Sequence, residues 1–127
     1  MIESKLLLDS SAWLEYFLNA DPQITEMITK DSCMLFASAI SLHEVKKRLL
    51  LAKMGPEMLE KSMSYMRDNS IVLDVSEEIL EKSADDSVRL GLALADSIIY
   101  RSALDIGAQI VTFDVDFSGK KGAMVMK

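Results

Sequence analysis

The pattern that decides the fold lies in residues 92–117, which read LALADSIIYRSALDIGAQIVTFDVDF. Apolar residues at helical spacing predict a helix over Leu94–Ile106, and Gly107 is a natural C-terminal cap. The apolar run that follows predicts a strand over Gln109–Phe113. A helix that leads into a buried strand is typical of a parallel sheet with helices on both faces.

The same alternation of strands and helices extends over the rest of the chain. We expect the other strands at Lys5–Asp9, Met34–Ala37, Ile71–Val75 and Ala123–Met126. We expect the other helices from Ser10 or Ser11 to Leu18, over Gln23–Lys30, from Ser41 to about Met54, from Pro56 onward and from Ser76 onward. These elements predict an α/β fold, a three-layer α/β/α sandwich with a mostly parallel central sheet. We expect residues 1–127 to form one domain.

The composition indicates a protein of the reducing cytoplasm. Half of the 127 residues are hydrophobic, so a core can form without disulfides or a structural metal. Cys33 is the only cysteine, which excludes an intramolecular disulfide. No apolar run approaches the roughly 20 residues that span a bilayer. The N-terminal segment lacks a signal-peptide cleavage site. We therefore expect a cytoplasmic location and no membrane contact.

The charge of the chain argues against broad, salt-driven binding of nucleic acid. The formal net charge is −6, whereas neutralising many phosphates requires an excess of lysine and arginine. A local contact through a metal ion remains compatible with this charge. The basic run Lys46, Lys47 and Arg48 is the main exception, and a solvated helix face is its ordinary explanation.

Four acidic residues occupy positions that a parallel sheet brings to one edge. Asp9 and Asp114 follow two of the predicted strands, and ligand sites of such sheets lie beyond the carboxyl ends of the strands. Glu44 and Asp96 fall within two of the predicted helices. Asp116 faces the same way as Asp114 if the strand continues through it. Gathering like charges costs free energy, so such clusters usually hold a hard divalent cation.

Each carboxylate also has a structural explanation. Asp9 can end a strand and cap the next helix. Glu44 follows Ser41 at the spacing of a capping box. Asp96 can be a buried N-cap if its helix begins at Ser97. That every carboxylate has only a structural role is the weaker interpretation, because the topology places the residues together at one edge of the sheet.

Other catalytic chemistries find little support. His43 is the only histidine, so a histidine-rich zinc site cannot form, and no nucleophile elbow accompanies it. The five glycines form no phosphate-binding loop. Cys33 lies in an apolar run and is more typical of a core than of a nucleophile.

Three segments resemble PIN-domain proteins, and in particular the VapC-type toxins of prokaryotic toxin–antitoxin pairs. They are LLLDSSAWLEYF (residues 6–17), SLHEVKKRL (41–49) and LGLALADSIIYRSALDIGAQIVTFDVDF (90–117). The resemblance extends over nearly the whole chain and is weakest over about residues 55–75. Its most specific part is Leu94–Phe117, where a helix with an aspartate leads into a strand and an aspartate-rich turn.

The resemblance implies a Mg²⁺- or Mn²⁺-dependent endoribonuclease with an α/β/α sandwich fold. The residues that it implies as catalytic are Asp9, Glu44, Asp96 and Asp114. The metal ligands that it implies are Asp9, Asp96, Asp114 and Asp116. The hydroxyls of Ser10 and Ser11 would orient those ligands from a second layer. The residues suggested for contact with RNA are Lys46, Lys47 and Arg48.

The resemblance also implies partners, and it leaves two alternatives open. It implies a small antitoxin and a homodimer, for which the predicted helices between Ser41 and Asn69 are the candidate surfaces. One alternative is a catalytically silent PIN-like scaffold that binds RNA or a protein. The other is a receiver-like phosphoacceptor domain, although Asp9 is followed by two serines rather than by an acidic residue.

Overall fold

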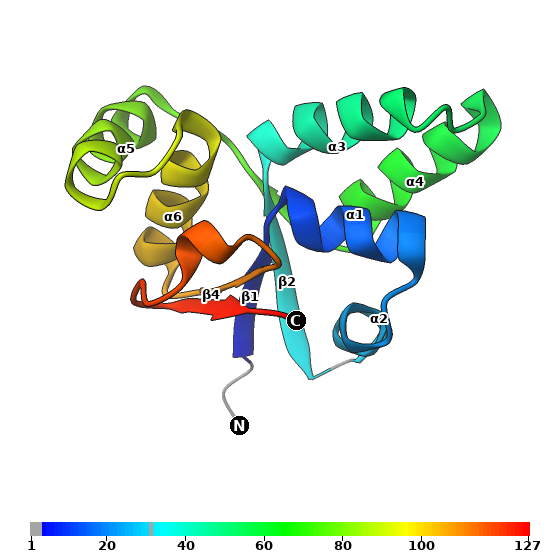
Figure 1. The fold of residues 1–127 in the computed structure, drawn as a ribbon, viewed down its shortest axis with the longest axis horizontal. Helices are drawn as coiled ribbons and strands as arrows, with labels where there is room; N and C mark the ends of the chain where they lie inside the picture. The colour runs from blue at the N-terminus through cyan, green and yellow to red at the C-terminus, as the bar shows by residue number, and fades with distance from the viewer. Residues whose placement is uncertain (1–3, 31) are drawn as a thin grey trace.

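The fold is built on a parallel sheet of five strands (Figure 1). A computed structural model of the protein describes residues 4–30 and 32–127. The strands are β1 (Ser4–Leu8), β2 (Cys33–Ser38), β3 (Ile71–Leu73), β4 (Gln109–Thr112) and β5 (Ala123–Val125). Their order in the sheet is β3-β2-β1-β4-β5, and each neighbouring pair is parallel. The predicted α/β sandwich is confirmed. Receiver domains have the order 2-1-3-4-5, so the receiver-like alternative does not fit this topology.

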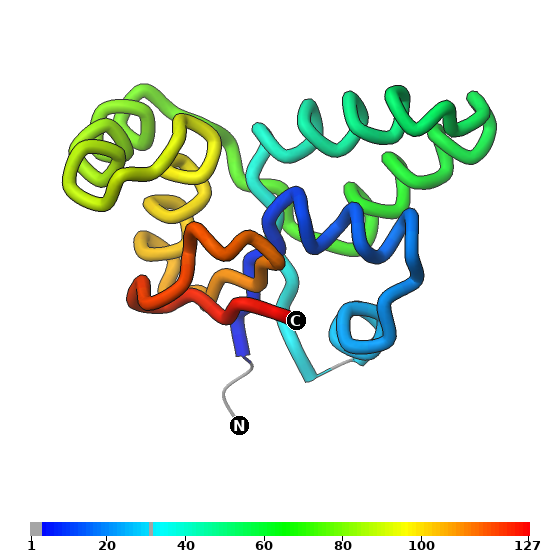
Figure 2. The backbone as a smooth tube through the Cα atoms, viewed as in Figure 1, coloured from blue at the N-terminus to red at the C-terminus, as the bar shows by residue number. Residues whose placement is uncertain are grey.

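Helices cover both faces of the sheet (Figures 1 and 2). One face carries α1 (Ser10–Asn19), α2 (Pro22–Thr29), α3 (Ala39–Leu51) and α4 (Pro56–Asp68). The opposite face carries α6 (Leu94–Ile106), on which α5 (Glu77–Leu90) packs. The short 3-10 helix η1 (Val115–Phe117) connects β4 to β5. Among the described residues, no helix combines the length and the apolar character needed to cross a membrane.

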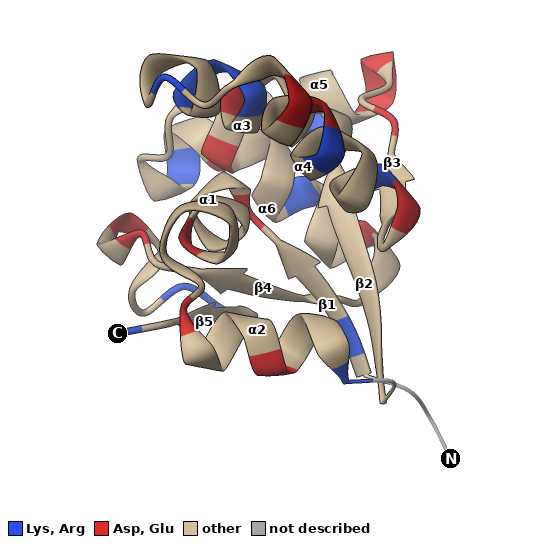
Figure 3. Ribbon diagram, turned by 90° about the vertical axis from the view of Figure 1, so that its right-hand side faces the viewer, with Lys and Arg blue, Asp and Glu red and all other residues tan. Residues whose placement is uncertain are grey.

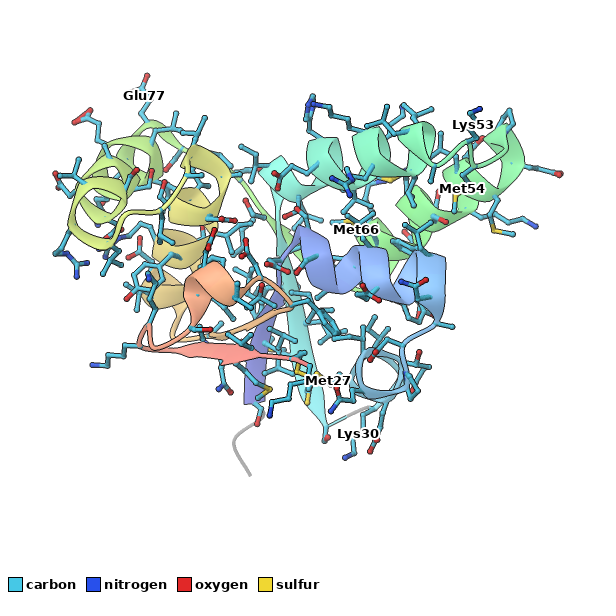
Figure 4. All side chains as sticks on the ribbon, in the orientation of Figure 1. Met27, Lys30, Lys53, Met54, Met66 and Glu77 are labelled. Atoms are coloured by element: carbon cyan, nitrogen blue, oxygen red, sulfur yellow. The ribbon has the colours of Figure 1, made fainter. Side chains whose placement is uncertain are left out.

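The leucines of β1 serve two separate cores because successive strand residues point to opposite faces. Leu6 and Leu8 belong to the core under α1–α4, which Met66 from α4 and Met27 from α2 help to fill (Figure 4). Leu7 belongs to the core under α6. All three leucines are buried, so the continuous apolar run within the predicted strand Lys5–Asp9 reflects burial on both faces.

The strand order reverses beside β1. The chain places β2 on one side of β1 and β4 on the other, so the crevice between the ends of β1 and β4 is a topological switch point. Leu8 pairs with Val111, and the Asp9 amide donates a hydrogen bond of 3.1 Å to the Val111 carbonyl. Asp9 therefore begins the loop at the position where α/β sheets usually bind ligands.

Helix α1 begins at Ser10, one of the two predicted starts, and Asp9 caps it. Asp9 is the N-cap, and its Oδ1 accepts a hydrogen bond of 3.0 Å from the Ala12 amide. Ser10 and Ser11 are the first two helical residues and not caps. The structural explanation for Asp9 is thus realised, which leaves both serine hydroxyls available for other contacts.

The start of α3 lies earlier than predicted. Ser38 is the N-cap, because its Oγ accepts a hydrogen bond of 3.3 Å from the Ile40 amide. The helix consequently begins at Ala39, two residues before Ser41. Glu44 lies in the second turn, so the predicted capping box is wrong and its carboxylate is available for contacts outside the helix.

A buried carboxylate joins α5 to α6. Asp86 is 1% exposed and accepts hydrogen bonds from Arg101, at 2.7 Å from Nε and 2.8 Å from Nη2. Arg89 adds a bond of 2.8 Å. The hydrogen bond from Arg101 is the main reason why the pKa of Asp86 lies below its ordinary value, and it outweighs the opposing effect of burial. Asp86 on α5 is thus joined to Arg101 on α6 by a hydrogen-bonded ion pair.

We expect Asp86→Ala to lower the free energy of unfolding by about 2–3 kcal/mol, because Arg101 then loses its buried partner. Asp85→Ala, at an exposed neighbouring position, is the control and should change the value by less than about 0.5 kcal/mol. Urea unfolding measures both. The contribution of Asp86 should be complete above about pH 5 and should decline as the pH falls through its ordinary and then its lowered pKa. Equal effects of the two variants would contradict a stabilising role of the ion pair.

Candidate active site

Asp9 is held rigidly at the junction of β1, α1 and β4. Its side chain is 3% exposed, and both carboxylate oxygens accept hydrogen bonds. Oδ1 accepts from the Ser11 hydroxyl at 2.6 Å and from the Ala12 amide, while Oδ2 accepts from the Thr112 hydroxyl. Burial raises the pKa of Asp9 above its ordinary value, and these hydrogen bonds offset part of that rise. The network fixes the carboxylate in one orientation.

Thr112 is a site residue that sequence reasoning missed. Its Oγ1 donates to Asp9 and accepts a hydrogen bond of 2.9 Å from the Asp114 amide. Ser11 forms a parallel link, because its Oγ accepts from the Phe113 amide at 2.9 Å. Two hydroxyls therefore join the end of β1 to the turn after β4. The sequence feature that could have indicated Thr112 is a polar residue that ends an apolar strand two positions before Asp114.

The turn after β4 differs from the predicted continuation of the strand. The strand ends at Thr112, and Asp114 caps η1 by accepting a hydrogen bond of 2.9 Å from the Asp116 amide. The expected strand alternation is therefore wrong. The turn nevertheless brings the acidic side chains together, because one carboxylate oxygen each of Asp96, Asp114 and Asp116 lies within 4.8 Å of the others.

Glu44 approaches the same place from α3. Its Oε1 accepts a hydrogen bond of 2.6 Å from the Ser10 hydroxyl, which lies at the start of α1. The second carboxylate oxygen of Glu44 accepts no hydrogen bond from the described part of the chain. The Ser10 hydroxyl thus fixes Glu44 while leaving one of its oxygens available to a ligand or a water molecule.

The acidic residues line one open pocket at the carboxyl ends of β1 and β4. The residues that line it are Asp9, Ser10, Ser11, Leu14, Glu44, Arg48, Asp96 and Asp114. All four residues that the sequence predicted as catalytic are among them. Asp116 is exposed and reaches the cluster from its edge. A larger hollow of about 610 Å³ lies at the amino ends of β1, β2 and β4, where Glu26 is already paired with Lys30.

The structure divides two of the predicted sets of residues, the metal ligands and the RNA contacts. Among the four predicted metal ligands, Asp9 lines the pocket but lies outside the group of three carboxylates within 4.8 Å. Among the three predicted RNA contacts, only Arg48 lines the pocket. Lys46 and Lys47 line a different hollow with His43, Leu50 and Leu51.

Asp96 shows how much negative charge the pocket contains. It is the third residue of α6, and Ala93 is the N-cap, so the alternative in which Asp96 caps a helix from Ser97 is wrong. Burial raises the pKa of Asp96 to about 6, and the charges of the other carboxylates add to the rise, with Asp114 and Asp9 contributing most. No lysine or arginine within residues 4–30 and 32–127 forms an ion pair with the carboxylates that line the pocket.

The donor set fits a hard divalent cation. Mg²⁺ and Mn²⁺ prefer oxygen ligands, and Asp96, Asp114 and Asp116 offer three carboxylate oxygens close to one another. A cation would also offset the repulsion among the carboxylates, which adds to the effect of burial on the pKa of Asp96. Softer metals prefer thiolate or imidazole ligands, and neither Cys33 nor His43 lines the pocket.

Comparison with known proteins identifies the family. Residues 6–122 match the model of the PIN domain. The chain belongs to the PIN-domain family. Among curated proteins, no sequence matches it significantly. The family assignment agrees with the position of the acidic pocket at the switch point of the sheet.

Solved structures share the fold over nearly the full length of this PIN domain. A toxin–antitoxin complex from Klebsiella pneumoniae superposes with a TM-score of 0.80 at 18% identity, covering 94% of this chain and 96% of that one. VapC20 from Mycobacterium tuberculosis, a toxin that cleaves the sarcin–ricin loop, gives 0.75 at 18% identity, with 96% and 99% covered. VapBC2 from Rickettsia felis, bound to promoter DNA, gives 0.73 at 14% identity, with 96% and 97% covered. At these identities the likeness establishes the fold alone.

The raised pKa of Asp96 predicts a pH-dependent cost of folding in the metal-free protein. The unfolded aspartate has a pKa near 3.9, whereas the folded value is about 6. The stabilising effect of the bound proton is complete below about pH 4 and is lost as the pH rises through 6. In EDTA, Asp96→Asn should therefore be more stable than the parent above pH 6, and the difference should disappear near pH 4.

Thermal unfolding between pH 4 and 8 measures this difference. Asp74→Asn, at an exposed aspartate that follows β3 and does not line the pocket, is the control and should show no such trend. A difference between Asp96→Asn and the parent that stays constant over this range would contradict the electrostatic explanation.

Proposed function

We propose that this PIN domain is a metal-dependent endoribonuclease and the toxin of a toxin–antitoxin pair. The observation that carries the proposal is the convergence of five carboxylates, four lining one pocket and Asp116 at its edge. Membership of the PIN family supports nuclease chemistry. The similarity of the fold to toxins, one of which cleaves the sarcin–ricin loop, supports RNA as the substrate.

The cofactor in this proposal is Mg²⁺ or Mn²⁺. Asp96, Asp114 and Asp116 would hold the ion, and Asp9 would contribute directly or through a water molecule. When bound, such an ion polarises a phosphate and lowers the pKa of a coordinated water. The hydrogen bonds from Ser11 and Thr112 would keep Asp9 from reorienting as ligands enter and leave.

Glu44 is the best candidate to accept a proton from the attacking water. Its Oε1 is held by Ser10, and its other oxygen is available within the pocket. A base must be positioned before it can act in the transition state, and the 2.6 Å hydrogen bond supplies that positioning. Asp114 is the alternative base, although its carboxylate already caps η1.

The proposed partners are a small antitoxin and a second copy of the chain, acting together in the cytoplasm. Of the structures of similar fold, one is a toxin–antitoxin complex and two others are VapBC assemblies bound to DNA. The surface that we propose for these contacts lies on α3 and α4, where Leu50, Leu51 and Met58 are 53%, 68% and 55% exposed. Lysine and arginine also gather on these two helices (Figure 3).

Cleavage of pooled cellular RNA by the purified protein tests the nuclease proposal. We expect cleavage with Mn²⁺ or Mg²⁺ and none with EDTA. Asp96→Asn removes one charge with little change of shape and should reduce the rate by about 100-fold or more. Asp74→Asn, at an exposed aspartate after β3 that does not line the pocket, should retain the parental rate.

Two outcomes would contradict the proposal. Equal cleavage by the parent and Asp96→Asn would indicate a contaminating nuclease. No cleavage by either protein, together with no heat of Mn²⁺ binding in calorimetry, would favour the catalytically silent scaffold.

A further inference from the structure

One positively charged side chain, that of Arg48, lines the pocket together with the carboxylates. Of the described residues that line it, Arg48 is the only basic one, and it lies one helical turn after Glu44 on α3. The rest of the basic run is directed elsewhere, since Lys46 and Lys47 line the hollow beside Leu50 and Leu51. Among the described residues, the pocket therefore has a single positively charged side chain in its lining.

Arg48 is not used to neutralise its acidic neighbours. Within residues 4–30 and 32–127, its guanidinium forms no ion pair within 4.0 Å and no hydrogen bond. Glu44 is four residues away on the same helix, a spacing at which ion pairs often form, yet it accepts its hydrogen bond from Ser10. Arg101 provides the contrast, because it is fully engaged with a buried aspartate. The guanidinium of Arg48 is exposed and available to an external anion.

We propose that Arg48 binds a phosphate of the RNA substrate at the acidic pocket, which rests on the nuclease function proposed above. A phosphodiester that enters the pocket meets five carboxylates, in a chain of net charge −6. A bound divalent ion would offset part of this repulsion, and a second positive group on the wall of the pocket would offset more. A guanidinium is suited to this role because its planar fork donates two parallel hydrogen bonds to phosphate.

The position of Arg48 would also place the substrate close to Glu44. Residues four apart on a helix lie on the same face, so a phosphate held by Arg48 is kept close to the available oxygen of Glu44. Arg48 is therefore a positioning residue whose loss should weaken substrate binding, whereas the metal site is formed by other residues.

Equilibrium binding of RNA is the first test. The probe is a fluorescein-labelled, random-sequence single-stranded RNA of 12 nucleotides with Mn²⁺, in an Asp96→Asn background that suppresses cleavage. Adding Arg48→Gln should weaken binding about 10- to 100-fold, the range for a lost hydrogen bond to a charged group. Arg48→Lys should be intermediate, because lysine retains the charge without the fork. Lys53→Gln removes the same charge two residues beyond the end of α3 and should change the dissociation constant less than about 2-fold (Figure 4).

Salt dependence and metal binding separate phosphate contact from a structural role. The slope of log affinity against log salt concentration should fall by about 0.7 in Arg48→Gln, the value for one phosphate contact on a single strand. Calorimetry should show Mn²⁺ binding to Arg48→Gln at least as tight as to the parent, since a positive charge has been removed from near the site. Weaker Mn²⁺ binding in Arg48→Gln would overturn the proposal, because Arg48 would then be organising the carboxylates.

Cleavage of pooled RNA distinguishes failure of this inference from failure of the proposed function. If the parent protein cleaves RNA and Arg48→Gln leaves the RNA affinity unchanged, the role of Arg48 is overturned and the nuclease proposal stands. Inactive parent protein overturns the nuclease, while the 12-nucleotide binding assay still decides whether Arg48 contacts phosphate.

Discussion

The buried carboxylate of Asp9 is the constraint on which the site depends. A charge with 3% of its side chain exposed is tolerated only if its oxygens are hydrogen-bonded. The partners are the Ser11 hydroxyl, the Ala12 amide and the Thr112 hydroxyl. Satisfying Asp9 therefore fixes where α1 begins and where β4 ends. The same contacts hold the turn that carries Asp114, because Thr112 accepts from its amide.

A rigid scaffold of this kind can hold like charges close together. The carboxylates reach the pocket from β1, α3, α6 and the turn after β4, and each is attached to an element that is packed in one of the two cores. Movement that would separate the charges would also disrupt that packing. Burial raises the pKa of Asp96, and the neighbouring carboxylates add to the rise. The carboxylates are thus held in place by the fold itself.

The sequence predicted the elements better than their ends. The prediction for α6 agrees with the structure at both ends, because Gly107 supplies a left-handed cap with φ of 69°. The start of α1 at Ser10 agrees with the prediction, whereas the start of α3 was wrong because Ser38, rather than Ser41, provides the capping oxygen. Several neighbouring residues can each cap a helix, and the position at which the preceding strand ends decides which of them does so.

The same limit applies to the site. That Asp9 and Asp114 would lie together followed from parallel topology, since both come after strands that end at one edge of the sheet. The hydrogen bond between Ser10 and Glu44 joins residues 34 positions apart, and the bond between Asp9 and Thr112 joins residues 103 apart. No local pattern encodes such pairs. They exist because the packing of α1 on α3 and the pairing of β1 with β4 bring the residues together.

Helix α3 shows how one element can serve two surfaces without conflict. Val45 and Leu49 are fully buried and anchor the helix to the core. Glu44 and Arg48, each one residue before an anchor, line the acidic pocket, whereas Leu50 and Leu51 line a separate hollow. A partner that binds the outer hollow would contact the same helix that positions Glu44 and Arg48. Because the anchors prevent the helix from shifting freely, such a partner would act on the site by blocking access or inserting a side chain rather than by moving α3.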